Sequence, residues 1–191
     1  MIRYLFAASL LLSLAACLPR TRPNGDPRPA DTDFGRLPEL LRAISKAGKV
    51  ALYERLPHQT FEKDQLESEK TVTLSGYPFY ADPLPLKPAY GKKLITALSD
   101  ARSYRDFSGE KLCGGFHPDY AVEFQVGKAT YHVLVCFGCG EAKLCGPKRD
   151  LRVDLSGDGK QDFAGLLKGY DQNRPEKPRP DVKPPHLTSA R

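Results

Sequence analysis

The chain has 191 residues, a formal net charge of +6 at pH 7, and 27% charged and 40% hydrophobic residues. Its basic residues are spread along the sequence and do not form a stripe with interleaved aromatics, so no nucleic-acid partner is expected. The sequence also contains no internal repeat, no P-loop, no dinucleotide-binding fingerprint and no Ser-His-Asp order.

Residues 1–17 have the layout of a bacterial export signal. Arg3 supplies a positive start, and an uncharged run from Tyr4 to Leu14 follows. That run is about eleven residues long, whereas a membrane-spanning helix needs roughly 20. The next residues, Leu14-Ala15-Ala16-Cys17, resemble the lipobox of bacterial lipoproteins. The resemblance implies a signal peptide over 1–16, cleavage before Cys17, and a covalent lipid on that thiol as a bilayer anchor. Leu18 is not the Asp that retains such proteins at the inner membrane, which implies the outer membrane facing the periplasm in a two-membrane organism.

Two proline-rich polar stretches flank the remaining chain. Residues 17–36 and 171–191 carry too few apolar side chains to offset the entropy of ordering them. The first is predicted to be a lipidated tether and the second a disordered basic tail. Residues 37–170 are then expected to form a single domain.

Apolar spacing predicts the elements of the first half of this domain. Leu37, Leu40, Leu41 and Ile44 lie on one face of an expected helix. The elements expected after it are a strand over Lys49 to Glu54, a loop over His58 to Lys70, a β-like segment over Thr71 to Tyr80, and a helix over Lys92 to Tyr104.

A hairpin within residues 119–137 is the clearest local prediction. Its two arms alternate between apolar and polar residues around Gly127-Lys128, a pair that suits a type II′ turn. The expected core-face pairs are Val126 with Ala129, Phe124 with Tyr131, Val122 with Val133, and Tyr120 with Val135. Glu123 and His132 would then face each other on the opposite, solvent side, so His132 is interpreted as a cross-strand partner and not a catalyst.

The last elements complete the predicted fold class. Gly140 to Leu144 is expected to give barely a turn, Leu151 to Leu155 a strand, and Gln161 to Lys168 a helix. Helices interleaved with antiparallel strands indicate an α+β domain, in which a small antiparallel sheet packs against two or three helices.

Four thiols remain besides Cys17, namely Cys113, Cys136, Cys139 and Cys145. Disulfides persist outside the cytoplasm, so one or two structural bridges are the first interpretation, with three possible connectivities. The hairpin register sets Asp119 opposite Cys136. Cys113 is therefore expected to lie within disulfide reach of Cys136 or Cys139.

Two other interpretations of these cysteines stay open. Cys113, His117, Cys136 and Cys139 form a C-x3-H…C-x2-C set that Zn²⁺ would accept. Alternatively, the Cys-x-x-Cys after a strand could carry out thiol–disulfide exchange, although thioredoxin-like enzymes place it at a helix start.

Asp154 to Asp162 resembles the start of an EF-hand calcium loop. Its twelfth position is Gly165 where the family has a bidentate Glu, so a turn followed by a helix N-cap from Ser156 or Asp158 is favoured over calcium.

From about Lys49 to Lys143, the chain resembles a family of bacterial exported proteins of unknown activity. The resemblance rests on Phe116-His117-Pro118-Asp119-Tyr120 and Cys136-Phe137-Gly138-Cys139, and it lends no reaction. The sequence therefore predicts an envelope lipoprotein with a non-enzymatic binding or structural domain and no cofactor beyond the lipid. Its expected partners are the bilayer and an envelope protein or the cell wall. The alternative is a redox or zinc-binding protein that uses the cysteines.

Overall fold

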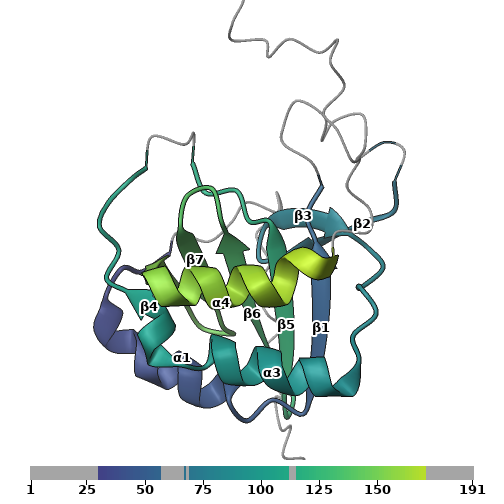
Figure 1. Cartoon of the computed structure of the whole chain (residues 1–191), viewed down its shortest axis with the longest axis horizontal. Helices are drawn as coiled ribbons and strands as arrows, with labels where there is room; N and C mark the ends of the chain where they lie inside the picture. Colours follow the sequence, from purple (N-terminus) through teal and green to yellow (C-terminus); the bar gives the residue numbers. More distant parts are fainter. Residues whose placement is uncertain (1–29, 57–66, 68, 112–114, 171–191) are drawn as a thin grey trace, which may run out of the picture.

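The computed structural model describes residues 30–56, 67, 69–111 and 115–170. A six-stranded antiparallel sheet, in the order β1-β5-β6-β7-β8-β4, carries three helices on one face (Figure 1). The helices are α1 (Leu37–Ile44), α3 (Pro88–Leu98) and α4 (Gly157–Leu167). The strands of the sheet are β1 (Lys49–Glu54), β4 (Tyr104–Arg105), β5 (Tyr120–Val126), β6 (Ala129–Cys136), β7 (Glu141–Cys145) and β8 (Asp150–Leu155). A separate hairpin pairs β2 (Thr71–Leu74) with β3 (Tyr77–Tyr80). The predicted α+β class is confirmed.

The β5–β6 hairpin has the predicted register at every pair. Val126 faces Ala129, and Glu123 faces His132. Gly127 has a φ of 59°, the left-handed conformation that the predicted turn requires of its first central residue. Beyond the ladder, the backbone N–H of Phe137 donates to the Asp119 carboxylate at 2.7 Å, which closes this end of the hairpin.

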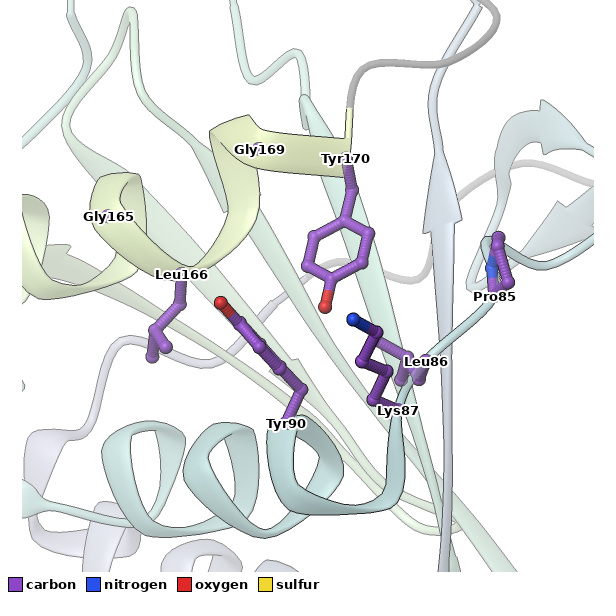
Figure 2. A pocket seen from close by; sticks show the side chains of 8 residues that line it. All are labelled: Pro85, Leu86, Lys87, Tyr90, Gly165, Leu166, Gly169 and Tyr170. Atoms are coloured by element: carbon purple, nitrogen blue, oxygen red, sulfur yellow. The ribbon is translucent and has the colours of Figure 1, made fainter.

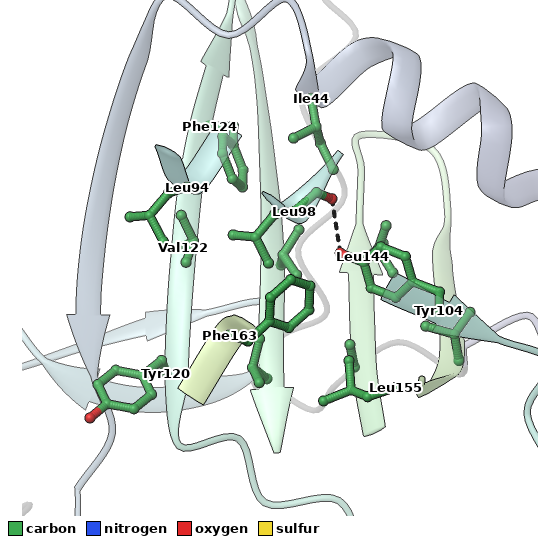
Figure 3. Close-up of a cluster of buried hydrophobic side chains, with 14 of the residues drawn as sticks. Ile44, Leu94, Leu98, Tyr104, Tyr120, Val122, Phe124, Leu144, Leu155 and Phe163 are labelled. Carbon is green, nitrogen blue, oxygen red and sulfur yellow. Dashed lines mark hydrogen bonds between the residues drawn. The ribbon is translucent and has the colours of Figure 1, made fainter. Parts of the chain in front are cut away.

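The main core lies between the helices and the first face of the sheet (Figure 3). Phe124, Val122 and Phe163 are completely buried there. The Tyr104 hydroxyl is buried too, and it donates to the Leu98 carbonyl at 2.8 Å, so this phenol does not lose a hydrogen bond on burial.

Two helices begin earlier than predicted. α3 starts at Pro88 instead of Lys92 and ends at Leu98, where a 3-10 turn (Ala101–Ser103) and β4 replace the predicted last residues. A proline fits the first turn of a helix, where its missing N–H has no partner to lose. α4 starts at Gly157 because Ser156 caps it by accepting from the Gly159 N–H at 3.0 Å. Apolar spacing marks only the core-facing turns, so it missed the first turn of both helices.

β7 corrects the prediction that Gly140 to Leu144 forms barely a turn. Residues Glu141–Cys145 form a central strand between β6 and β8. The strand buries Ala142 and Leu144 in the main core and Glu141 and Cys145 on the other side.

The β2–β3 hairpin covers the second face of the sheet, which corrects the prediction that His132 faces solvent. Leu74 and Phe79 of the hairpin pack there with Ala121, Leu134 and Cys136. The His132 side chain is only 15% exposed. Its partner Glu123 was predicted correctly, but its surroundings were not.

Contacts with the sheet begin within the predicted tether, because the Asp31 N–H donates to the Asp150 carbonyl at 2.7 Å. The signal peptide, Cys17, Cys113, most of the loop from His58 and the tail over 171–191 lie outside the described residues. Within the described ranges, no helix is both long and apolar enough to cross a membrane.

Candidate functional site

The cysteines predicted to act together lie at two separate places on the second face. Cys136 ends β6, and its Sγ accepts from the Cys139 N–H at 3.1 Å. The Cys139 thiol in turn donates to the Gly115 carbonyl at 3.2 Å. No disulfide joins Cys136, Cys139 and Cys145 to one another. Cys113 lies outside the described residues, so its bridge to Cys136 or Cys139 stays a prediction.

Cys145 cannot belong to that group. It pairs with His132 across the β6–β7 ladder, four residues before Cys136. That spacing corresponds to roughly 13 Å along a strand, beyond the roughly 7 Å that a disulfide allows. Burial is the main reason that the pKa of the Cys145 thiol is raised to about 12, and the negative charge of the Asp150 carboxylate is the second reason. Because the thiolate is the reactive form, this cysteine is an inert, buried thiol at neutral pH.

No described His, Cys, Asp and Glu side chains gather in a group of three that could hold a metal ion. One member of the proposed zinc set, Cys113, lies outside the described residues. The structure therefore describes only His117, Cys136 and Cys139 of that set. Residues of the calcium-like segment make other interactions. Asp154 accepts from the Lys111 ammonium at 3.0 Å, and Ser156 caps α4. The predicted helix N-cap is therefore confirmed, and Ser156 supplies it.

His132 connects the second face to the β2–β3 turn. Its Nδ1 lies 2.9 Å from the Ser75 hydroxyl, and its Nε2 lies 3.2 Å from a Glu123 carboxylate oxygen. Burial lowers the pKa of His132 despite the opposing effect of Glu123, so the imidazole is neutral at pH 7. The order serine, histidine, carboxylate spans three elements, and sequence analysis did not bring Ser75 to this site.

A groove of about 490 Å³ lies on the helical side of the molecule, where the start of α3 meets the end of α4 (Figure 2). Tyr90 of α3 and Tyr170, just beyond α4, meet edge to face with ring centroids 5.7 Å apart. The Lys87 side chain points toward the Tyr170 hydroxyl (Figure 2). Pro85, Leu86 and Leu166 supply apolar walls.

Two glycines leave the α4 side of this groove bare. Gly165 and Gly169 both line it, and a Cβ added at either position would meet nothing within 4 Å. A ligand can therefore approach the helix backbone closely. Burial raises the pKa of Tyr170, and the neighbouring Tyr90 raises it further. This phenol is therefore a hydrogen-bond donor at neutral pH.

Sequence analysis did not predict the groove, and it named Gly165 only as a departure from the calcium-loop pattern. Tyr90 and Tyr170 are separated by most of the domain, and only the packing of α3 against α4 brings them together. The one local signal is the pair of glycines spaced by four in a helical segment.

No known protein family, no curated protein and no solved structure matches this chain.

Proposed function

We propose that the chain is a lipid-anchored envelope protein whose domain binds acidic saccharides of the cell wall in the groove between α3 and α4. The observation that carries this proposal is the grouping of Tyr90, Tyr170 and Lys87 around one open cavity. Its volume is within the roughly 300–1,000 Å³ of small-ligand sites.

The chemistry of the lining favours a sugar ring with a carboxylate. A tyrosine presents an apolar ring face that can cover the C–H groups of a pyranose, together with a hydroxyl that hydrogen-bonds to its polar edge. The Lys87 ammonium is a compact positive charge on a flexible stem, suited to a carboxylate without fixed geometry. Lys93 adds positive charge nearby, because its Nζ lies 5.3 Å from the centre of the Tyr90 ring.

The proposal is tested by adding N-acetylmuramic acid to the ¹⁵N-labelled chain and following backbone amide signals by NMR. We expect saturable shifts at Gly165 and Gly169, and weaker binding of the neutral sugar N-acetylglucosamine. Lys87→Gln should remove the preference for the acid, and Gly165→Leu should fill the groove and abolish both titrations. Lys87 makes no side-chain cap hydrogen bond to α3, so its loss should not unfold the helix.

Lys92→Gln is the matched control, because it removes the same charge from an exposed position of α3 outside the groove. If neither sugar shifts the glycine signals, or if both groove variants bind like the parent, saccharide binding at this groove is wrong.

The anchor is proposed from the residues around Cys17 and has its own test. Cys17→Ser should block processing and release the protein from the membrane, because serine cannot form the thioether to lipid. We expect the parent chain to fractionate with the outer membrane of a two-membrane host, as Leu18 implies. A variant that matures and fractionates like the parent contradicts lipidation, and recovery of the parent in inner membranes contradicts the location.

A further inference from the structure

Ser75, His132 and Glu123 form a continuous hydrogen-bonded chain on the second face, away from the groove. Ser75 Oγ lies 2.9 Å from His132 Nδ1, and His132 Nε2 lies 3.2 Å from Glu123 Oε2. These distances are within the reach required between a nucleophile, its base and the group that orients the base. Hydrolytic triads are recognised by the geometry and roles of their three groups and not by sequence order. Here the two ring nitrogens exchange those roles, because Nδ1 faces the serine and Nε2 faces the carboxylate.

The protonation and exposure of the three groups suit nucleophilic catalysis. A neutral His132 whose Nε2–H donates to Glu123 leaves Nδ1 as the acceptor of the Ser75 proton. Glu123 is 30% exposed, and Ser75 is half-buried, so the chain of groups opens to solvent at the turn. The Cys145 thiol is a second hydrogen-bond partner of the Ser75 hydroxyl, but it is buried, so the serine is the more accessible nucleophile.

The turn that carries Ser75 also has backbone amides next to the nucleophile. Ser75 and Gly76 have φ values of 49° and 84°, the pattern of a type I′ turn. Within the described part of the chain, no hydrogen bond is made by the backbone N–H of either residue. Free amide donors beside a nucleophile can stabilise the tetrahedral intermediate of acyl transfer.

We propose that this site hydrolyses carboxylic esters through an acyl-serine intermediate at Ser75. Ser75 Oγ attacks the ester carbonyl carbon while His132 Nδ1 takes its proton. The C–O bond to the alcohol then breaks, and the alcohol leaves with that proton. Water next attacks the acyl-serine, again with His132 as base, and releases the carboxylic acid and the free hydroxyl. Glu123 is a positioning residue that holds the imidazole and stabilises its charged form.

The test uses the purified full chain with a fluorophosphonate probe and p-nitrophenyl acetate. We expect one covalent label, located on the peptide that contains Ser75, and measurable ester hydrolysis. Ser75→Gly should abolish both. Glycine tolerates the left-handed backbone of residue 75, so this variant keeps the turn. His132→Gln should reduce the rate of labelling by roughly 100-fold or more, the usual contribution of a general base.

Two further variants separate catalysis from folding. Glu123→Gln keeps a hydrogen-bonding oxygen but not the charge, so it should slow hydrolysis while leaving the melting temperature close to that of the parent. Ser45→Ala removes an exposed hydroxyl at the end of α1 and should change nothing. The proposal is overturned if the parent chain takes no label, or if Ser75→Gly or His132→Gln is labelled as fast as the parent. Because those variants alter different elements, unfolding of one leaves the other as the deciding measurement.

Discussion

Arg152→Met should lower the free energy of unfolding by roughly 3 to 5 kcal/mol, the usual cost of removing one partner from a buried ion pair. The expected loss is large because Glu141 is completely buried and Arg152 is the cation that neutralises it. Chemical denaturation of the purified variant and parent, followed by circular dichroism, measures the difference.

The geometry explains why Arg152 is difficult to replace. Its Nε donates to Glu141 Oε2 at 2.8 Å, and its Nη1 donates to Glu110 at 2.7 Å. The guanidinium also lies over the Phe107 ring, 4.3 Å from its centre. Glu141 Oε1 has no hydrogen-bond partner among the described residues, and beyond Arg152 this carboxylate has only a Coulombic attraction to Lys143.

Two further variants isolate the buried pair. Glu110→Gln removes only the exposed carboxylate, which is 74% accessible, and should cost less than about 1 kcal/mol. The double variant Arg152→Met, Glu141→Leu removes both charges and should recover most of the lost stability. A single Arg152→Met variant as stable as the parent would mean that Glu141 finds another partner or water.

The β5–β6 hairpin could be predicted to the residue because its information is local. The turn is set by Gly127, and strict alternation fixes which side chains share a face. The same alternation could not say what covers the polar face. That depends on β2–β3, whose Ser75 lies 57 residues before His132 in the sequence.

β7 was not predicted because its local sequence is typical of a loop, whereas the segment forms a central strand. Glu141 and Lys143 are polar residues in a short segment between glycines, a composition typical of a loop. The strand forms because its neighbours satisfy those groups. Arg152 of β8 neutralises Glu141, and Lys143 donates to the Tyr77 hydroxyl at 2.6 Å. Both partners come from other elements, so no window of sequence around β7 contains the signal.

Gly159→Ala should lower the free energy of unfolding by roughly 3 kcal/mol, at the upper end of the usual cost of overpacking. Gly159 is buried in the first turn of α4, against the 3-10 turn that ends at Ser103. A Cβ at this position would lie 2.3 Å from the Ser103 carbonyl oxygen and 2.7 Å from its Cα. Both are backbone atoms. The Ser103 carbonyl is also held by the Ser156 N–H at 2.9 Å, so it cannot move aside without losing that bond.

Gly165→Ala provides the matched control within the same helix. An added Cβ there meets nothing within 4 Å, so only helix propensity acts, and stability should rise by about 0.5 to 1 kcal/mol. Chemical denaturation of the two variants under the same conditions should therefore give changes of opposite sign. Because the substitution is identical, the difference measures the contact between α4 and Ser103. If both alanines stabilise the chain, the first turn of α4 does not lie against Ser103 as tightly as the structure places it.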